Sequence, residues 1–258
     1  MSFKSSETAS SGANQVAHLY YVSAGETLTP GRTATLSGDE ARHAASVSRL
    51  GVGEDILIGD GLGTIAEASA EKVSAIEVLV EIHDITFHPR LEPEVWLVQA
   101  LAKGDRDELA IQTCTELGVD RIIPWQASRS VSQWKGDKIP KGVARWQKIV
   151  TEAAKQSLRA WVPPVDQPVT TKDLAHLGTT TQLVLLDPDA TDSLSAYIPP
   201  QDRPLVVIVG PEGGIDPRER DLLMDSGAID LKLGSTVLRT SSAGPAALAL
   251  LNASMGRW

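Results

Sequence analysis

The sequence predicts an α/β protein built from a small antiparallel β domain and a larger domain in which a mostly parallel sheet lies between helices. In the first part of the chain, short alternating segments are joined by glycine-bearing turns, which is typical of antiparallel strands. In the second part, nearly continuous apolar runs such as EVWLVQAL and PLVVIVG alternate with helical patterns. Such runs are typical of parallel strands that helices cover on both faces.

The 258 residues are enough for two domains, each with a core of its own. Residues 1–16 are polar and serine-rich, so we expect a disordered tail there. The β domain is predicted over 17–88 and the α/β domain over 92–258, with the prolines of HPRLEPE marking the linker. The tail lacks an apolar segment and no run approaches the roughly 20 apolar residues of a membrane-spanning helix, so we expect a soluble, cytoplasmic protein.

The β domain begins with a short strand in HLYYVSA. A short helix is expected in the next segment, TATLSGDEARHAASV, because Ser37 and Glu40 have the spacing of a capping box. Further short strands are predicted in EDILIGD, IAEASAEK and IEVLVEIHDITF.

Five strands of the α/β domain are predicted in EVWLVQAL, RIIPW, QLVLLDPD, PLVVIVG and IDLKLG. Asp105 and Glu108 have capping-box spacing at the start of the helix in GDRDELAIQTCTELG. A long helix covers KGVARWQKIVTEAAKQSLRAW, and the helix in DPRERDLLMDSG has Asp216 as its cap with Glu219 completing a box. The last helix lies in SSAGPAALALLNASM, where Pro245 is tolerated only in the first turn.

Composition and charge narrow the classes of function. Cys114 is the only cysteine, which excludes a disulfide framework and a thiolate metal cluster; we expect it to fill space in a helix and predict no metal site. The net charge of −9 would ordinarily count against a nucleic-acid partner, because such binding depends largely on Lys and Arg. Residues 121–160, however, hold nine basic and two acidic residues, a local charge of +7 that leaves −16 for the rest.

Much of this local charge lies on one face of the long helix. Its charged residues are spaced by 4, 3, 4, 3 and 4 positions, which places them on a narrow stripe opposite Val143, Trp146, Ile149, Val150 and Ala153. The stripe consists of Lys141, Arg145, Lys148, Glu152, Lys155 and Arg159. An ordinary solvated face is one interpretation; a stripe of nearly one sign in an acidic chain, extended by Arg129, Lys135 and Lys138, favours a polyanion-binding surface.

Three tryptophans lie in or beside the basic segment, at positions 125, 134 and 161. Indole rings can stack on exposed bases. Packing in the core or at its rim is the more common role for each one taken alone.

The loop LVVIVGPEGGID does not fit the templates for phosphate binding. Gly210, Gly213 and Gly214 lack the G-x-G-x-x-G spacing, the chain has no GK[ST] motif, and Pro211 removes a backbone N–H donor. The loop still follows a buried strand, at the edge where open α/β sheets bind ligands, and it carries the carboxylate of Glu212.

A second unusual loop, LKLGSTVLRTSSAG over 231–244, also follows a strand and carries a glycine. Each loop alone is compatible with an ordinary turn. Two such loops side by side predict a pocket that wraps a small amphipathic ligand through main-chain contacts.

These two loops carry a resemblance to a known family. GPEGGIDPRE followed by LKLGSTVLRTSSA resembles the paired signature of the SPOUT methyltransferases, and within them the 16S rRNA (uracil-N3)-methyltransferase family. TELGVDRIIPW, RWQKIVTEAAKQSLRAWVPPV and the N-terminal ARHAASVSRLGVGEDILIGDG are similar to further blocks of that family, the last to its PUA-like RNA-binding module. One departure is Ser241, which stands where the family often has Glu.

The resemblance implies a trefoil knot in the α/β domain, a PUA-like β-barrel before it, and a homodimer whose sites the partner subunit completes. It also implies S-adenosylmethionine as the cofactor, bound by three loops. On this chain the cofactor-binding positions are Leu185, Leu186, Asp187, Gly210, Pro211, Glu212, Gly213, Leu233, Gly234, Thr236, Val237 and Leu238. The implied partner is 16S rRNA in the small ribosomal subunit, with candidate contacts at Arg129, Lys141, Arg145, Lys148, Lys155, Gln156, Arg159, His43 and Arg49.

Methylation of a uracil ring nitrogen requires loss of a weakly acidic N–H proton. The candidate catalytic residues are Arg239, which would stabilise the resulting anion and position the base, and Glu212. Glu212 has two interpretations, as the proton acceptor or as a structural group that satisfies backbone donors of its loop. Water or the RNA itself are further candidates for the acceptor.

Two other classes of function compete with this hypothesis. A nonenzymatic RNA-binding or ribosome-assembly protein would share the basic helix but would not need the two glycine loops. A nucleotide-dependent oxidoreductase or hydrolase would use the strand, loop and helix at Gly210, and the glycine spacing argues against it.

Overall fold

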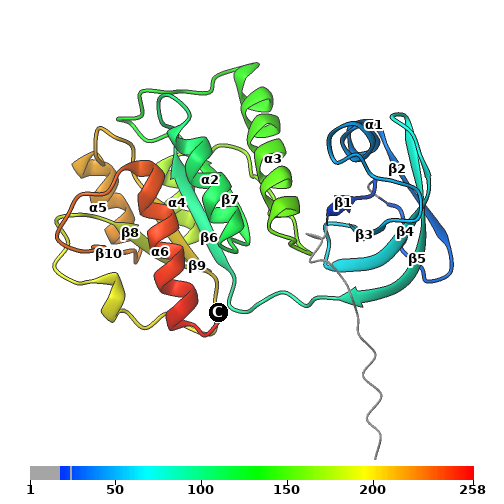
Figure 1. Cartoon of the computed structure of the whole chain (residues 1–258). Coiled ribbons are helices and arrows are strands. Elements are labelled where there is room, and N and C mark those ends of the chain that lie inside the picture. The colour runs from blue at the N-terminus through cyan, green and yellow to red at the C-terminus, as the bar shows by residue number, and fades with distance from the viewer. Residues whose placement is uncertain (1–17, 24) are drawn as a thin grey trace, which may run out of the picture. The chain divides into compact units, whose positions relative to one another are not determined.

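A computed structural model describes residues 18–23 and 25–258, so the expected tail at 1–16 lies outside the described residues. The chain forms two compact units (Figure 1). One comprises the described residues up to Ile58 together with Ala66–Ile85, and the other comprises Gly59–Ile65 and Thr86–Trp258. The tip of one β-hairpin, at 59–65, therefore packs with the C-terminal unit.

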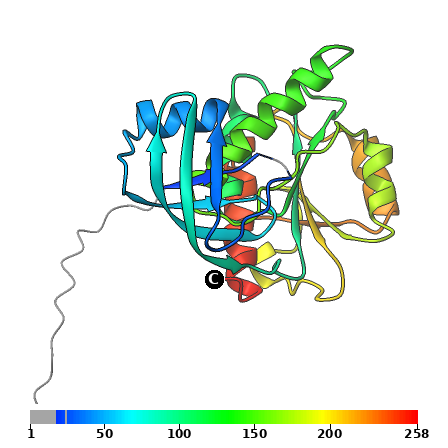
Figure 2. The same cartoon turned by 90° about the vertical axis from the view of Figure 1, so that its right-hand side faces the viewer.

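The N-terminal unit is a curled sheet of five strands in the order β1-β3-β4-β5-β2 (Figure 2). The strands are β1 (Leu19–Tyr21), β2 (Thr33–Ser37), β3 (Asp55–Gly59), β4 (Thr64–Val73) and β5 (Glu77–Phe87). Alternate side chains such as Leu36, Ile58, Val80 and Ile82 form its core, as a sheet with one buried face requires. The sequence pattern did not predict β2, which pairs antiparallel with β5.

A short helix follows β2, as expected, but the prediction of a capping box at its start is wrong. Helix α1 (Gly38–Arg42) continues directly into a π-helical turn, η1 (His43–Val47). The Ser37 side chain makes no capping hydrogen bond, because Ser37 is still the last residue of β2 and lies opposite Glu77 in the sheet register.

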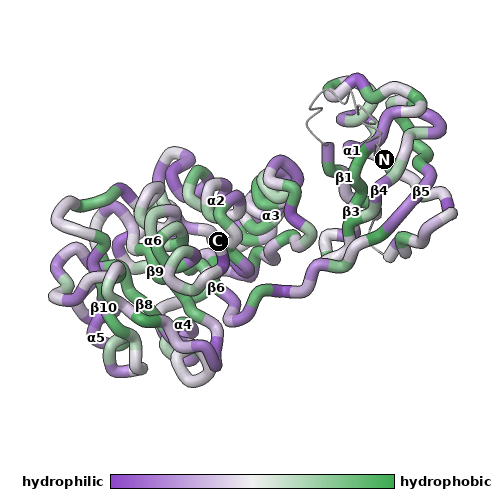
Figure 3. The backbone as a smooth tube through the Cα atoms, turned by 60° about the horizontal axis from the view of Figure 1, so that its bottom comes forward, coloured by the Kyte–Doolittle hydropathy of each residue, from purple (hydrophilic) through white to green (hydrophobic). Residues whose placement is uncertain are grey.

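The C-terminal unit contains the predicted parallel sheet. Its order is β10-β8-β9-β6-β7, and every neighbouring pair is parallel. The strands are β6 (Val95–Ala100), β7 (Arg121–Trp125), β8 (Gln182–Leu186), β9 (Leu205–Val209) and β10 (Ile229–Leu231). Consecutive residues of β6, β7, β8 and β9 are buried, and these strands are mostly hydrophobic (Figure 3), which confirms the prediction that both faces of the sheet are covered.

Helices form a layer on each face of this sheet (Figure 1). Leu97 and Val207 point to the face covered by α2 (Arg106–Glu116), α3 (Lys138–Gln156) and α6 (Thr240–Ser254). Val98 and Ile208, one residue further along, point to the face covered by α4 (Thr171–Leu177) and α5 (Pro217–Asp225). Cys114 lies fully buried in α2, as expected, and burial raises the pKa of its thiol.

The expected capping box of α2 is wrong. Asp105 precedes the helix with a left-handed backbone, at φ of 60°, and its side chain makes no capping hydrogen bond. Instead the buried carboxylate of Asp107 accepts a hydrogen bond from the Ala102 N–H at 3.0 Å and one from the Glu108 N–H. The carboxylate that holds the start of this helix therefore lies inside the first turn.

At the start of helix α5, the predicted cap at Asp216 is confirmed and the predicted role of Glu219 in a capping box is wrong. The Asp216 side chain caps the helix by accepting from the Arg218 N–H at 3.0 Å. Glu219 does not complete a box; its carboxylate accepts hydrogen bonds from the Ser128 N–H and hydroxyl and from the Thr171 hydroxyl. Glu219 thus ties α5 to the loop after β7 and to α4.

The position expected for Pro245 is also wrong. Helix α6 begins at Thr240, so Pro245 lies inside the helix and beyond its first turn. The helix starts early because Thr240 is anchored by hydrogen bonds to other elements, as described below. Helix α4, with a capping box of Thr170 and Asp173, and the 3₁₀ turn η2 (Leu194–Ala196) were not predicted. Among the described residues, no helix has the length and hydropathy needed to cross a membrane.

Candidate functional site

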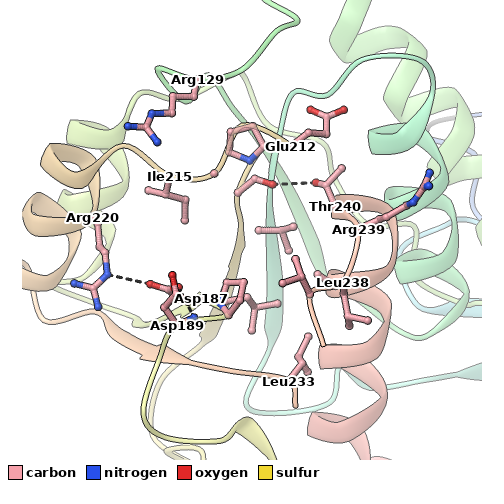
Figure 4. Close-up of a pocket in the computed structure, with 18 of the residues that line it drawn as sticks. Arg129, Asp187, Asp189, Glu212, Ile215, Arg220, Leu233, Leu238, Arg239 and Thr240 are labelled. Carbon is pink, nitrogen blue, oxygen red and sulfur yellow. Dashed lines mark hydrogen bonds and ion pairs between the residues drawn. The ribbon is translucent and has the colours of Figure 1, made fainter. Parts of the chain in front are cut away.

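A cavity of about 780 Å³ lies at the carboxyl ends of β8, β9 and β10, bounded by the loops that follow these strands (Figure 4). Two of these loops are the glycine loops that the sequence singled out, and the third follows β8. Ten of the predicted cofactor-binding residues line the cavity: Leu186, Asp187, Gly210, Pro211, Glu212, Leu233, Gly234, Thr236, Val237 and Leu238. The sheet edge and the paired loops therefore meet as the sequence predicted.

Two residues of that predicted set do not line the cavity. Leu185 is fully buried in the core beneath α4 and α5, because neighbouring residues of a strand point to opposite faces of the sheet. Gly213 lies against the loop after β7, where an added Cβ would approach the Arg129 carbonyl oxygen to 3.2 Å. Gly213 thus permits two loops to touch.

Gly210 permits a closer contact. A Cβ at this position would lie 2.7 Å from Cγ1 of Ile215, a distance that real side chains do not tolerate. Ile215 itself lines the cavity. The glycine is therefore required for the loop to fold back over the end of β9.

A chain of hydrogen bonds connects the two glycine loops through the sheet. Gln99, fully buried in β6, donates from Nε2 to the Thr240 hydroxyl at 2.8 Å. The Thr240 hydroxyl in turn donates to the Gly210 carbonyl oxygen at 3.0 Å. A central strand, the start of α6 and the glycine loop are thereby held together at the base of the cavity (Figure 4).

Glu212 is engaged by groups outside its own loop. Its carboxylate accepts from the Lys103 N–H at 3.2 Å and pairs with the Arg106 guanidinium at 3.1 Å. Burial acts to raise its pKa, but the backbone hydrogen bonds and Arg106 outweigh this and hold the pKa below its ordinary value. A carboxylate in this state is a weak proton acceptor.

The loop after β8 is held by an ion-pair network that the sequence pattern did not predict. Asp187 pairs with Arg220 of α5 at 3.0 Å, and Arg220 also pairs with Asp230 of β10. The second Asp187 oxygen accepts from the Asp189 N–H at 2.9 Å. In the sequence Arg220 is one charge among several in a polar helix, so no local pattern could have predicted its role in the cavity wall.

Two family models match this chain. The one described as an RNA methyltransferase domain covers residues 89–252, and the one described as an RNA methyltransferase PUA domain covers residues 36–82. The chain belongs to this RNA methyltransferase family. The fold predicted from the resemblance is confirmed, with a PUA domain before an α/β methyltransferase domain, whereas the trefoil threading stays a prediction.

Relatives of this methyltransferase family share most of the chain. Ribosomal RNA small subunit methyltransferase E of Mycobacterium bovis is 39% identical over 249 residues, which are 94% of each chain. The protein of that name in Bacillus subtilis is 31% identical over 220 residues, 82% of this chain and 86% of the relative. The crystal structure of a ribosomal RNA small subunit methyltransferase E from Neisseria gonorrhoeae, bound to S-adenosyl methionine, matches this chain with a TM-score of 0.82 at 29% identity. The match covers 92% of this chain and 97% of that chain.

Arg239, a candidate catalytic residue of this methyltransferase, is the residue before α6 and lines the cavity with an exposed side chain. In Figure 4 it lies on the side of α6, across the cavity from Asp187 and Arg220. Ser241 is half-buried in the first turn of α6 and is not among the cavity-lining residues.

The basic stripe of α3 is only partly available to an RNA. Lys141, Lys148 and Gln156 are exposed, as predicted. Arg145 forms a two-pronged ion pair with Glu108 of α2, at 2.6 and 2.7 Å, although its side chain stays 62% exposed.

Two members of the stripe do not point to solvent. The Lys155 side chain is only 4% exposed and pairs with Glu152 at 2.8 Å. Arg159 follows the end of the helix, and its guanidinium donates to the Thr115 carbonyl oxygen at 2.8 Å. The predicted stripe is interrupted here because α3 ends at Gln156 and its last turn is packed against the domain.

The three tryptophans are placed as packing residues. Trp125 is fully buried in β7, and Trp134 packs edge-on against the buried Trp146 at 5.1 Å between ring centroids. Trp161 is half-buried beneath the Arg90 guanidinium.

Of the three remaining candidate RNA contacts, Arg129 lines the cavity and pairs with Asp216 at 3.3 Å. The other two lie in the N-terminal unit. His43 begins η1 and packs edge-on against Tyr20, with its Nδ1 buried, whereas Arg49 is exposed in a left-handed turn. Over the described part of the chain, no cluster of three or more His, Cys, Asp and Glu side chains is arranged to hold a metal ion.

Proposed function

We propose that this protein transfers the methyl group of S-adenosylmethionine to N3 of a specific uridine in 16S rRNA of the small ribosomal subunit. The observation that carries the proposal is the cavity at the ends of β8, β9 and β10, walled by backbone of two glycine loops that Gln99 and Thr240 hold together. Its place in an RNA methyltransferase family and the relatives named for rRNA of the small subunit support the substrate class.

The residues around the cavity fit the cofactor. A volume of about 780 Å³ lies in the range of roughly 300–1,000 Å³ that suits small-molecule sites. Backbone groups of Gly210, Leu233 and Thr236 and the apolar side chains of Ile215 and Leu238 would hold it, with Asp187 at the rim. When bound, the cofactor supplies an electrophilic methyl group on a sulfonium.

The chain has to deal with the N3 proton of the uracil. In this proposal Arg239, which precedes α6 and lines the cavity, stabilises negative charge on the ring carbonyl oxygens and positions the base. Glu212 acts structurally in this proposal, because its carboxylate is occupied by Lys103 and Arg106 and its pKa is lowered. The proton then leaves to water or to a group of the RNA.

RNA is bound in this proposal by the exposed part of α3, with Lys141, Lys148 and Gln156, by Arg129, and by the PUA domain with His43 and Arg49. We further propose a homodimer that completes each site, and a cytoplasmic location, where the small ribosomal subunit is found. Sedimentation of the purified chain tests the dimer.

Calorimetric titration with S-adenosylmethionine tests the proposed cofactor site. Saturable binding that is lost on substitution of a cavity residue supports it. If the folded protein gives no measurable heat of binding, the proposed enzymatic function is contradicted. The alternative, a nonenzymatic RNA-binding protein of the same fold, is then favoured.

A further inference from the structure

A second pocket, of about 300 Å³, lies in the C-terminal unit away from the candidate methyl-donor cavity. It is lined by the segment 88–91, by 117–120 at the end of α2, by 159–161 after α3, and by the C-terminal residues of the chain. Asp120 immediately precedes Arg121, the first residue of β7, so this pocket lies at the amino ends of the strands. The methyl-donor cavity lies at their carboxyl ends, on the order of 15 Å away for strands of about five residues.

Arg257 is the unusual residue of this pocket. Its side chain is 5% exposed, and Nη2 donates to Asp120 at 2.8 Å. Its Nε and Nη1 are buried and have no hydrogen-bond partner among residues 18–23 and 25–258. Buried N–H groups of a guanidinium are strongly destabilising unless something accepts their hydrogen bonds. The acceptor for these two groups therefore lies outside the described residues.

The charge of the pocket indicates what that acceptor is. Three guanidinium groups line it, from Arg90, Arg159 and Arg257, against one side-chain carboxylate of the lining, that of Asp120; Arg90 is also paired with Glu94 at 3.1 Å. Asp120 is itself 92% buried and shares one oxygen between Arg257 and the Val95 N–H. A net positive, arginine-lined pocket favours an oxyanion over water, and the fork of N–H donors on a guanidinium matches a phosphate.

Aromatic surface lies beside these charges. Trp161 lines the pocket, with the Arg90 guanidinium stacked 4.1 Å above its ring and its own Nε1 donating to the His88 carbonyl oxygen. Trp258 lines the same pocket and is 68% exposed. A phosphate flanked by planar bases suits this combination of guanidinium and indole groups better than a bare inorganic anion.

We propose that the pocket around Arg257 binds a backbone phosphate of the RNA substrate, anchoring the strand at a point remote from the methyl-transfer site. This inference rests on the proposed rRNA substrate. It also assigns a role to Arg159, which lines this pocket and not the exposed stripe of α3. Arg257 binds and positions RNA in this proposal and takes no part in the chemistry.

The test compares full-length wild type with Arg257→Gln, Arg257→Lys and Asp120→Asn, and with Lys172→Gln as a control that removes one exposed charge on α4. Affinity for a 16S rRNA fragment is measured by fluorescence anisotropy at several salt concentrations. We expect Arg257→Gln to weaken binding on the order of tenfold and to reduce the slope of log K against log salt by about 0.7, the value for one lost contact to a single strand. Asp120→Asn removes the competing carboxylate and should tighten binding.

The remaining outcomes separate the alternatives. If Arg257→Gln and Asp120→Asn lower the melting temperature and neither changes RNA affinity, the ion pair is structural and the proposal is wrong. If inorganic phosphate raises the melting temperature of wild type but not of Arg257→Gln, while RNA affinity is equal, the pocket takes a free phosphate and the RNA assignment is overturned. Arg257→Lys serves if Arg257→Gln does not fold, because it keeps the charge opposite Asp120 and loses the N–H fork.

Calorimetry with S-adenosylmethionine is run on the same variants. Unchanged cofactor binding in Arg257→Gln is expected. If wild type itself does not bind S-adenosylmethionine, the proposed function is contradicted. The RNA affinities of wild type and Arg257→Gln would still test the phosphate site.

Discussion

The Thr240 hydroxyl donates a hydrogen bond to the Gly210 carbonyl oxygen at 3.0 Å, joining the start of α6 to the glycine loop after β9. Thr240→Val removes this hydroxyl with little change in shape. The Gly210 carbonyl oxygen then loses this donor, and the buried Gln99 amide keeps only its longer bond to the Ala100 carbonyl oxygen, at 3.2 Å. We expect a loss of about 1–3 kcal/mol in the free energy of unfolding and weaker cofactor binding. Urea denaturation and calorimetry measure the two effects. Thr240→Ser, which keeps the hydroxyl, should behave like wild type; equal loss in both variants would contradict the role of the hydrogen bond.

Gly210→Ala should distort the loop, because its Cβ would lie 2.7 Å from Ile215 Cγ1. We expect cofactor affinity to fall by tenfold or more, as a rough estimate for a cavity wall displaced by a steric clash. Ile215→Ala removes the clashing atoms, so the double variant should recover part of the affinity. A double-mutant cycle measures this coupling. Additive losses would show that contact with Ile215 is not the reason for the glycine.

Glu212→Gln should retain most of the methylation rate, because Gln still accepts from the Lys103 N–H. Single-turnover rates across pH measure this; a large loss together with the disappearance of an acidic limb would instead identify Glu212 as the proton acceptor.

The folded-state pKa of Glu212 is depressed below the ordinary 4.5, so its contribution to stability is present above pH 4.5 and is lost as pH falls through the lower, folded value.

Charge reversals along α3 should separate two kinds of lysine. Lys148 is exposed, so Lys148→Glu should weaken RNA binding and leave both cofactor binding and the melting temperature near wild type. Lys155 is buried against Glu152, so Lys155→Glu should destabilise the fold by about 1–3 kcal/mol. Thermal melts and RNA titrations of the two variants make the comparison. Equal effects of both on RNA affinity, with stability unchanged, would contradict the burial of Lys155.

Much of the fold could be predicted from the sequence, because strands buried on both faces and the caps at Asp216 and Pro217 leave local patterns. The cavity could be predicted as well, since loops after parallel strands meet at one sheet edge. The spacing of Asp105 with Glu108 and of Ser37 with Glu40 fits a capping box, yet neither box forms. Ser37 is held in β2 opposite Glu77, and at α2 the Asp107 carboxylate accepts the hydrogen bond of the Ala102 N–H instead.

Residues whose roles depend on distant contacts could not be found in this way. Gln99 is one polar residue in an apolar strand, and its partner Thr240 lies 141 positions away. Arg220 and Arg257 resemble surface charges in the sequence, but the first holds the loop after β8 and the second is buried beside Asp120. Periodicity reports which face of an element is apolar and carries no record of which charges the tertiary fold encloses.

The central claim is tested most directly by mapping methylated nucleosides in 16S rRNA by mass spectrometry, in cells with and without this protein. The proposal predicts that one 3-methyluridine disappears in the deletion strain and returns when the wild-type chain is restored, but not when Arg239→Ala is supplied at equal abundance. Persistence of every 3-methyluridine in the deletion strain would contradict it.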